Sequence, residues 1–389
     1  MSSRLAMEST LPRRQPWRGS STRTLLDCEK LNHTNMTSLS MSNTYLITGG
    51  SGFLGCHLAE DLLKRGHKVR TLDIAPLEEP GLVGHVEATL GDVRDEEAVR
   101  KALQGADRVI HAAAALPLAS RQEILSTNRG GTKNVLKKVQ EQGRSRLIHI
   151  SSTAVYGVPD RHPIHEDDEL VGVGAYGESK ILAEQLIQEF REQGSVITCI
   201  RPKTFIGTGR LGVFQILFDW VQKGARIPII GSGKNRYQLL EVKDLVEAII
   251  LAAEGDEQLA NDTFNVGATE FLTVKDDMGA LCSAAGSGSR ILPTPALPVK
   301  AVLRLLEKMR LSPLYQWVYD TADKDSFVST ERIQRSLGWK PKYSNADTLV
   351  NTYHWYENEY PAYQGKVGTT HKVAWDQGAL RLVRKVLGG

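Results

Sequence analysis

Apolar and polar positions between residues 44 and 74 change from a strand-like pattern to a helical one and back. The run "YLIT" (45–48) is short and apolar, and Leu58, Leu62 and Leu63 then recur at helical spacing. "KVRTLDI" (68–74) follows with the alternation of a second strand. A strand, a helix and a strand in this order predict a βαβ unit.

The alternation of strands and helices continues along the chain. "DRVIHAAA" (107–114) predicts a buried strand, residues 126–143 a helix, and "SRLIHI" (145–150) a strand that runs into a loop at Ser151. Strands that alternate with helices form parallel sheets, and their ligands bind at the carboxyl ends of the strands. We therefore expect an α/β protein with a Rossmann-type doubly wound parallel sheet.

Glycines fill the first turn of the βαβ unit. Gly49, Gly52 and Gly55 would let the backbone approach a pyrophosphate, whose charge the helix N-terminus favours. Asp73 ends the second strand, where a carboxylate accepts hydrogen bonds from a ribose. No Lys or Arg follows Asp73 until Arg94, so we expect NAD rather than NADP. The predicted cofactor-binding residues are Gly49, Ser51, Gly52, Phe53, Leu54, Gly55, Asp73, Asp92, Val93, Ala112 and Ala113, together with Tyr176 and Lys180.

"GAYGESK" (174–180) places a tyrosine and a lysine four residues apart. On a helix this spacing puts Tyr176 and Lys180 on one face, about one turn apart. The pair alone fits a surface helix with an extended lysine as well as a phenol whose proton is loosened by an ammonium. The surrounding motifs decide between the two interpretations.

Ten motifs in order make the chain resemble the extended short-chain dehydrogenase/reductases, the NAD-dependent epimerase/dehydratase group. The resemblance spans roughly residues 44–358. The motifs are "TGGSGFLG" (48–55), Asp73, "GDVRD" (91–95), "HAAA" (111–114), "NRGGTKNV" (128–135), "SSTAVYG" (151–157), "YGESK" (176–180), "RPKTFIG" (201–207), "GSGKN…EVKDLVEAI" (231–249) and "LGWKPKYS" (337–344).

The resemblance implies catalytic roles for four residues. Tyr176 matches the catalytic tyrosine, Lys180 its lysine and Ser152 the serine that holds the substrate oxygen, with Thr153 as the alternative; Asn128 supports the site from a neighbouring helix. A phenol has a pKa of about 10 and is a poor base at neutral pH. We expect the ammonium of Lys180 to lower that pKa. His111 and His149 are expected in the core or beside the cofactor.

The substrate positions depart from those of the nucleotide-sugar enzymes in the family. Thr204 stands where these enzymes carry an Asn for the diphosphate, and Tyr237 where they carry an Arg. Arg236 is one residue away, which on a strand means the opposite face. "GSGKN" (231–235) is more similar to the sterol-dehydrogenase branch. In the 4,6-dehydratases of the family an acidic pair follows the threonine, whereas Ala154 follows Thr153 here, so dehydration by that mechanism is not expected. The predicted substrate residues are Thr153, Thr204 and Tyr237.

The order of the predicted strands and helices also indicates how the chain divides into domains. Residues 211–231 predict a helix and a short strand, and residues 239–254 a strand and helix that return to the first domain. We expect a disordered tail at 1–42, an NAD-binding domain at 43–201 plus 237–267, a substrate domain at 202–236 plus 268–360 and a C-terminal extension at 361–389. Within 291–312, Val299, Val302, Leu303, Leu306 and Met309 form one helical face, either a cap on the core or a substrate mouth or membrane-surface contact.

Charge and cysteine content narrow the partners. The net charge of the 389 residues is +3, but the tail holds the excess and the rest carries equal numbers of basic and acidic groups. A body without a basic excess argues against nucleic-acid binding. The tail resembles a transit peptide or reflects a start at Met36 or Met41, and we favour the later start. Four cysteines without paired spacing indicate a reducing compartment and no metal site.

The expected protein is a cytoplasmic, NAD-dependent oxidoreductase. It would transfer a hydride between NAD(H) and a secondary alcohol or ketone carbon of a small apolar alcohol or sugar derivative. The alternatives are a nucleotide-sugar epimerase with tightly bound NAD and a non-catalytic NAD-binding sensor, which the Ser–Tyr–Lys set disfavours. We expect no transmembrane segment, although peripheral membrane contact stays open. The resemblance also implies a homodimer packed through a four-helix bundle that includes the Tyr176 helix.

Overall fold

The computed structural model describes residues 42–143, 146–211, 213–309, 316–359, 380, 383–384 and 387–388. The predicted tail therefore lies outside the described residues, apart from Ser42, and so does most of the C-terminal extension. Among the described residues no helix has the length and apolar character needed to cross a membrane.

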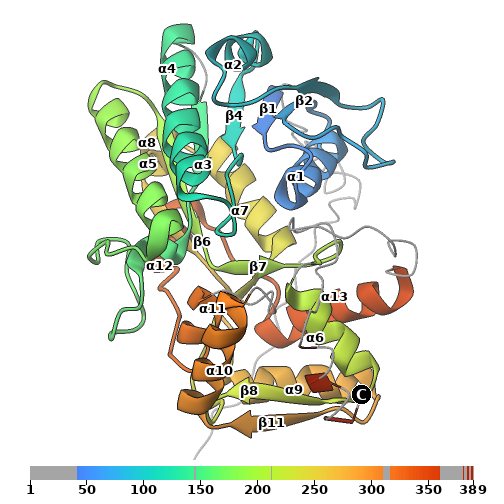
Figure 1. Ribbon diagram of the computed structural model, residues 1–389. Helices are drawn as coiled ribbons and strands as arrows, with labels where there is room; N and C mark the ends of the chain where they lie inside the picture. The colour runs from blue at the N-terminus through green and yellow to red at the C-terminus, as the bar shows by residue number, and fades with distance from the viewer. Residues whose placement is uncertain are drawn as a thin grey trace, which may run out of the picture. The chain divides into compact units, whose positions relative to one another are not determined.

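Seven parallel strands form the central sheet, which confirms the predicted fold class (Figure 1). Their spatial order is β10-β6-β5-β4-β1-β2-β3, with every neighbouring pair parallel. From β1 the chain adds β2 and β3 on one side and then β4, β5, β6 and β10 on the other. The point between β1 and β4 where this strand order switches is the crevice in which such sheets bind ligands. The strands are β1 (Thr44–Thr48), β2 (Lys68–Asp73), β3 (Glu87–Leu90), β4 (Arg108–His111), β5 (Arg146–Ile150), β6 (Ile197–Pro202) and β10 (Thr263–Val266).

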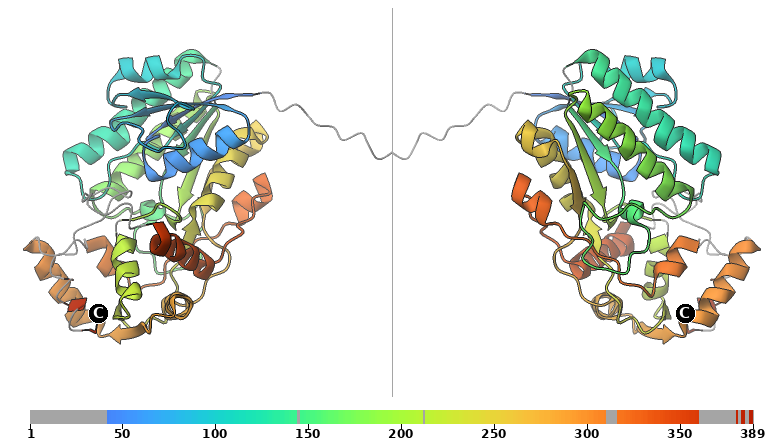
Figure 2. Two further views of the ribbon diagram at one scale, coloured as in Figure 1. Left: turned by 90° about the vertical axis from the view of Figure 1, so that its right-hand side faces the viewer. Right: turned by 90° about the vertical axis from the view of Figure 1, so that its left-hand side faces the viewer.

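Helices cover both faces of this sheet (Figure 2). Tyr45 and Ile47 of β1 pack in one apolar cluster with α1 (Phe53–Lys64) and α7 (Val242–Glu254). Leu46 points to the other face, because side chains alternate along a strand. It packs there with α2 (Glu96–Leu103), α4 (Thr132–Gln142) and α5 (Gly174–Glu192). The short α8 (Glu257–Ala260) and α12 (Glu331–Leu337) lie near β10.

A third apolar cluster organises the lower part of Figure 1. It joins α6 (Val213–Gln222), α9 (Val274–Ala285) and α13 (Asn345–Glu359) around Phe218 and Tyr353. The parallel pair β8 (Arg226–Ile230) and β11 (Arg290–Thr294) belongs to this part, with α10 (Ala296–Lys308) and α11 (Gln316–Thr321) beside it. From the C-terminal extension, Leu380 and Leu387 pack against the same cluster.

Two segments differ from the sequence predictions. The strand predicted after residue 238, β9 (Leu239–Glu241), pairs with β7 (Thr204–Ile206) in a separate sheet and does not join the central one. The helix predicted over 126–143 starts earlier, as α3 (Arg121–Leu125), and passes through a π-helical segment, Ser126–Gly131, before α4.

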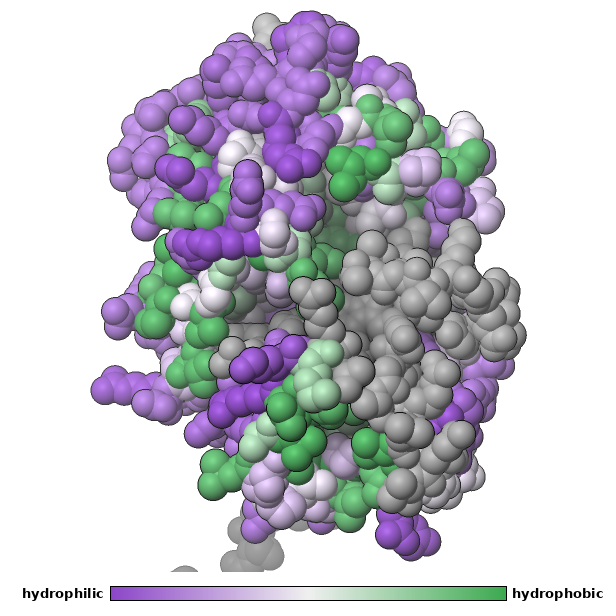
Figure 3. Space-filling model, viewed as in Figure 1, coloured by the Kyte–Doolittle hydropathy of each residue, from purple (hydrophilic) through white to green (hydrophobic). Residues whose placement is uncertain are grey.

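The apolar face predicted around residues 299–309 is only partly packed. Leu303 is buried, whereas Val302 and Met309 are each 56% exposed. Successive residues are turned by about 100° around a helix, so the predicted face was too wide for one contact and its outer edge remains in solvent. Apolar residues gather near α10 in Figure 3, while polar residues cover α2 and α4.

Candidate active site

The glycine-rich turn between β1 and α1 has no room for side chains at two positions. Gly49 has a φ of +74°, and a Cβ there would lie 2.8 Å from the backbone nitrogen of Ala113. A Cβ on Gly55 would lie 2.3 Å from the carbonyl oxygen of Gly49. No side chain caps the first turn of α1, which starts at Phe53. Backbone N–H groups without a capping side chain suit an anionic pyrophosphate, so this cradle fits the predicted dinucleotide.

The glycine-rich turn borders a large cavity, and Asp73, at the end of β2, borders this cavity too. Its carboxylate accepts hydrogen bonds from the backbone N–H groups of Ser51 and Ala75, both at 2.9 Å. Asp92 also lines the cavity, but its carboxylate pairs with the guanidinium of Arg94 at 2.5 Å. Arg94 therefore reaches the cavity already neutralised by its neighbour. The other predicted cofactor-binding residues, Ser51, Gly52, Leu54, Val93, Ala112 and Ala113, line this cavity too.

Two buried histidines lie beneath the cofactor crevice. His111 Nδ1 lies 2.7 Å from Thr48 Oγ1, and His111 Nε2 lies 2.9 Å from Thr132 Oγ1. The ring of His149 is 5.3 Å from that of His111, and neither of its nitrogens has a hydrogen-bond partner among the described residues. Burial lowers the pKa of His111 to about 3. Neither histidine lines the cavity, as expected for core residues beside the cofactor.

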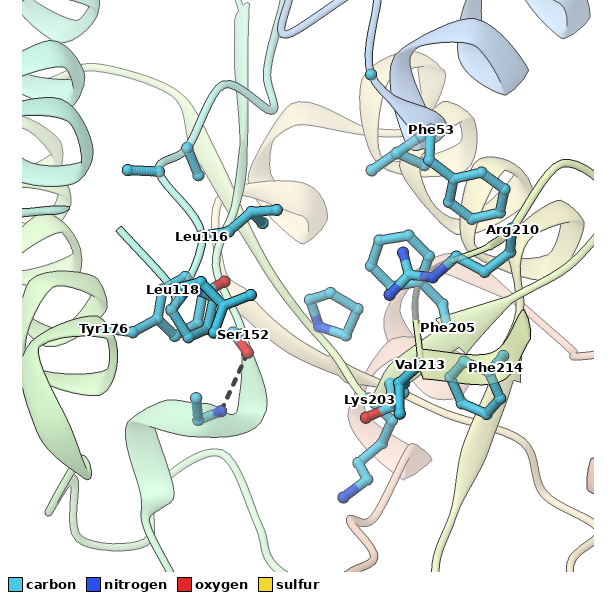
Figure 4. Close-up of a pocket in the computed structure, with 18 of the residues that line it drawn as sticks. Phe53, Leu116, Leu118, Ser152, Tyr176, Lys203, Phe205, Arg210, Val213 and Phe214 are labelled. Atoms are coloured by element: carbon cyan, nitrogen blue, oxygen red, sulfur yellow. Dashed lines mark hydrogen bonds between the residues drawn. The ribbon is translucent and has the colours of Figure 1, made fainter. Parts of the chain in front are cut away.

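Ser152 and Tyr176 lie on one side of the cavity (Figure 4), and Lys180 lines the cavity too. Ser152 follows β5, whereas Tyr176 and Lys180 lie one turn apart on α5. The ammonium of Lys180 donates to the carbonyl of Ile150 at 2.8 Å and lies 5.8 Å from the centre of the Tyr176 ring. The hydroxyl of Ser152 accepts a hydrogen bond from the backbone N–H of Ala154 at 3.1 Å, and Ser152 lines the same part of the cavity as Tyr176. The structure therefore brings the three residues together; what they catalyse stays a prediction.

The electrostatics of Tyr176 differ from the sequence expectation. Burial raises the pKa of its phenol to about 12, and the hydrogen bond from Ser152 and the charge of Arg210 oppose that rise only in part. Lys180 is not among the groups that oppose the rise, and burial lowers the pKa of its own ammonium to about 8, so it is charged only below that pH. The pKa of the Tyr176 phenol is higher than that of the Lys180 ammonium, so the amine is already neutral at the pH where the phenol would ionise. A lysine lowers a neighbouring pKa only while it is charged.

Asn128 supports the site from a distance. The π-helical segment turns its side chain into the protein, where Nδ2 donates to Ser179 Oγ at 3.0 Å and Oδ1 accepts from the N–H of Ala115 at 2.7 Å. Ser179 in turn donates to the carbonyl of Tyr176 at 2.7 Å. Asn128 does not line the cavity. It is therefore placed to position α5 and the loop after β4, and not to touch a substrate.

The predicted substrate residues all border the cavity but are bonded to the protein. Thr204 Oγ1 and the hydroxyl of Tyr237 lie 3.0 Å apart, so the two residues at the expected diphosphate positions bind each other. Thr153 Oγ1 donates to the carbonyl of Pro202 at 3.3 Å. Tyr156 lies outside this cavity, and its hydroxyl donates to Asn265 at 2.8 Å.

Two cations in the cavity wall were not predicted. Lys203 lies between β6 and β7, and Arg210 extends from the loop after β7 toward the middle of the cavity (Figure 4). The guanidinium of Arg210 lies over the rings of Phe53 and Phe205, at 5.2 and 5.5 Å. Residue 203 is outside both strands, so the alternation rule, which would have placed Lys203 and Thr204 on opposite faces, does not apply there.

These features define a nucleotide-binding α/β protein with a hydroxyl–phenol–ammonium group beside the crevice. Residues 45–267 match the model of the NAD dependent epimerase/dehydratase family, so the chain belongs to this family. This confirms the predicted family, NAD as its cofactor and an enzyme of the extended short-chain dehydrogenase/reductase type.

Three similar proteins illustrate the range of the family. An uncharacterized protein, y4nG, of Sinorhizobium fredii is 35% identical over 87% of this chain and 85% of its own length. A 3 beta-hydroxysteroid dehydrogenase/Delta 5→4-isomerase of Mycobacterium tuberculosis is 27% identical over 80% of this chain and 90% of its own. The crystal structure of a UDP-glucose 4-epimerase from Thermotoga maritima superposes with a TM-score of 0.68 at 23% identity, covering 82% of this chain and 99% of that one.

Proposed function

We propose that the protein is an NAD-dependent oxidoreductase that acts at a secondary alcohol or ketone carbon of a largely apolar substrate. The observation that carries this proposal is the grouping of Ser152, Tyr176 and Lys180 on the wall of a cavity that also contains the glycine turn. The cavity measures about 2050 Å³, whereas a site for one small ligand measures roughly 300–1,000 Å³. It therefore has room for a dinucleotide and a second molecule.

The three side chains divide the proton chemistry between them. NAD, when bound, supplies the hydride acceptor or, as NADH, the donor. In oxidation the phenolate of Tyr176 takes the hydroxyl proton of the alcohol and becomes the neutral phenol, and in reduction the neutral phenol gives its proton to the ketone oxygen and becomes the phenolate. Ser152, on the same wall of the cavity, would hold that oxygen through a hydrogen bond from its hydroxyl. Near neutral pH Lys180 is mostly charged, since its pKa is about 8, and it stabilises the phenolate that forms.

The part of the cavity around the loop after β4, β7 and α6, called the substrate half below, favours an apolar molecule. Side chains from the loop after β4, from β7 and from α6 line it, and they are mostly large and apolar: Leu217, together with Leu116, Leu118, Phe205, Val213 and Phe214 (Figure 4). A hydroxysteroid dehydrogenase among the similar proteins acts on a molecule of this class by its name. The bond between Thr204 and Tyr237 supports the same choice, because both would have to turn away to meet a nucleotide diphosphate.

A nucleotide-sugar epimerase is the second candidate. Lys203 and Arg210 favour it, because two cations in one wall match a diphosphate. An epimerase oxidises and then reduces the same substrate, so it needs NAD that stays bound through the cycle. Nucleotide released on denaturing the freshly purified full chain would favour the epimerase. A protein that purifies without nucleotide and binds NADH on addition would favour the dehydrogenase.

The decisive variant is Tyr176→Phe. Without the phenolic proton, turnover of a 3β-hydroxysteroid should fall by about 10³-fold, while NADH affinity should stay within about twofold because the ring is kept. Formation of NADH, followed by its absorbance, and a fluorescence titration with NADH measure the two quantities. UDP-glucose is assayed in parallel by chromatography of the sugar product.

Tyr156→Phe is the matched control. It removes a buried phenolic hydroxyl that bonds to Asn265 and Arg201 outside the cavity, so turnover should remain close to that of the wild type even if the protein is less stable. Wild-type turnover in Tyr176→Phe would refute the proposed acid/base. A wild-type protein that binds NADH but converts no substrate of either class would instead support the NAD-binding sensor.

A further inference from the structure

Lys203 is a buried lysine without a carboxylate partner, and burial lowers the pKa of its ammonium to about 7. The residue is 4% exposed and borders the substrate half of the cavity. Its ammonium donates to Ser326 Oγ at 2.6 Å and lies 5.0 Å from the centre of the Tyr237 ring. Among the residues that the structure describes, no carboxylate oxygen lies within the 4.0 Å of an ion pair. The hydroxyl and the ring solvate the charge without neutralising it.

A nearby buried cation, Arg201, does have a carboxylate partner. Arg201, two residues earlier and also buried, binds both oxygens of Glu184, at 3.0 and 3.1 Å through Nε. A buried charge is costly unless it is paired and hydrogen-bonded. Arg201 meets that condition within the protein, whereas Lys203 does not. An ammonium that is buried and faces a cavity can meet it with an anion from a ligand.

The other charged side chains in the wall of the substrate half are one cation and three carboxylates, none of which forms an ion pair with Lys203 among the described residues. Arg210 lines the same cavity. Each of the three carboxylates has a partner of its own: Asp277 accepts from Asn345 Nδ2 at 2.8 Å, Glu307 accepts from the hydroxyl of Tyr319, and Asp320 pairs with Arg304 at 2.8 Å. Large apolar side chains surround these groups. Lys203 therefore stands without an ion-pair partner in a largely apolar wall, which suits a molecule that is mostly apolar and carries one anionic group.

We propose that Lys203 binds an anionic group, a carboxylate or a phosphate, of the substrate. This inference rests on the proposed function only in taking the bound molecule to be the substrate. A carboxylate on an apolar skeleton and the diphosphate of a nucleotide sugar share the required chemistry. Lys203 is a specificity residue in this proposal, because it selects the molecule and takes no part in the transfer of hydride or proton.

The test measures binding without turnover. Decanoate, decanol and inorganic pyrophosphate are titrated calorimetrically into the NADH-saturated full chain. Decanoate should bind the wild type at least about tenfold more tightly than decanol, as a hydrogen bond to a charged group provides. Lys203→Met should lose that advantage and leave the affinity for decanol and NADH within about twofold. Pyrophosphate binding in place of decanoate binding would identify the diphosphate as the source of the anion.

Two further variants separate binding from folding. Lys203→Arg keeps the charge and should retain a measurable preference for the anion. Lys234→Met removes an exposed lysine and should change neither the affinity for decanoate nor that for decanol. Because an unpaired buried charge is removed, the melting temperature of Lys203→Met should equal or exceed that of the wild type, by up to about 4 °C. A lower melting temperature with unchanged anion binding would mean that Lys203 serves the fold alone.

The outcome is independent of the catalytic proposal. Tyr176→Phe should bind decanoate like the wild type, since the phenol is not part of the anion site. If neither decanoate nor pyrophosphate binds better than decanol, the anion site is refuted while the Tyr176 experiment still stands. If the anion binds through Lys203 but Tyr176→Phe keeps full turnover, only the catalytic proposal fails.

Discussion

In the cofactor half of the cavity, glycines and alanines bring the backbone to the wall, whereas large side chains form the wall of the substrate half. The glycine turn at 49–55 and the alanines after β4 leave no space between backbone and cavity. Around α6 and β7 the wall consists of phenylalanine, leucine and tryptophan side chains with isolated charges among them. The first surface depends on positions where nothing larger fits, and the second on the sum of many contacts.

This difference predicts unequal tolerance to substitution. A side chain added to the cofactor half collides with backbone, which cannot rotate away. A side chain changed in the substrate half has neighbours that can adjust their rotamers, so its effect should fall on substrate choice more than on folding. The following substitutions test that contrast.

Gly55→Ala should have the largest effect. Its Cβ would lie 2.3 Å from the carbonyl oxygen of Gly49 and 2.6 Å from the Cα of Gly50. The turn must open to admit it, at a cost of roughly 3 kcal/mol of stability, and NADH affinity should fall by at least about 100-fold because the cradle is displaced. Denaturant unfolding and NADH fluorescence measure the two effects.

Gly279→Ala is the matched control in the substrate half. Gly279 lies within α9, and a Cβ there meets nothing within 4 Å. Alanine should stabilise the protein by about 0.5–1 kcal/mol, because it is a better helix former than glycine. Equal destabilisation by both substitutions would contradict the contrast between the two halves.

Glu241→Gln should have the next largest effect, and only at higher pH. Burial raises the pKa of Glu241 from 4.5 to about 8, and its Oε2 has no hydrogen-bond partner among the described residues. Between these values the folded carboxyl keeps a proton that the unfolded chain releases, so wild-type stability falls as the pH rises through this window. Glutamine does not titrate, and we expect the variant to be more stable by roughly 2 kcal/mol above the window.

The measurement is unfolding by urea at a series of pH values. Below the unfolded pKa the two proteins should be about equally stable, because both side chains are neutral. A variant that is destabilised by the same amount at every pH would show that Glu241 is needed as an acceptor and is ionised in the native protein.

The cofactor half could be predicted from the sequence because its determinants are close together in the chain. Gly49, Gly52 and Gly55 belong to one turn, and Tyr176 and Lys180 to one helix, so local spacing alone places them correctly. Asp73 follows from the length of a single helix between two strands. The order of strands and helices along the chain likewise determined the parallel sheet.

The substrate half could not be predicted in the same way. Its wall joins residues from 202–239 with residues from 274–349, and no local spacing connects Lys203 to Ser326 or Thr204 to Tyr237. The inward turn of Asn128 depends on a π-helical segment, which a period of 3.6 residues does not anticipate. The low pKa of Lys180 follows from burial, which spacing does not reveal either.

Asp73→Asn should have the smallest effect, a change in cofactor preference. The carboxylate is held at the rim by two backbone N–H groups, so its charge faces the place where a 2′-phosphate would lie. Such a repulsion amounts to about 4 kcal/mol at about 4 Å in a partly solvated site. Solvent and salt reduce it further, and we expect the ratio of NADPH to NADH affinity to rise by about 10- to 100-fold.

Glu87→Gln provides the control, because it removes an exposed carboxylate from β3, which follows β2 at the edge of the sheet, without touching the cavity. If the ratio of affinities changes equally in both variants, the general charge of the domain sets the preference. If it changes in neither, Arg94 is the better explanation, since its pairing with Asp92 leaves no cation for the phosphate. Asp92→Asn would then release Arg94 and raise NADPH affinity where Asp73→Asn did not.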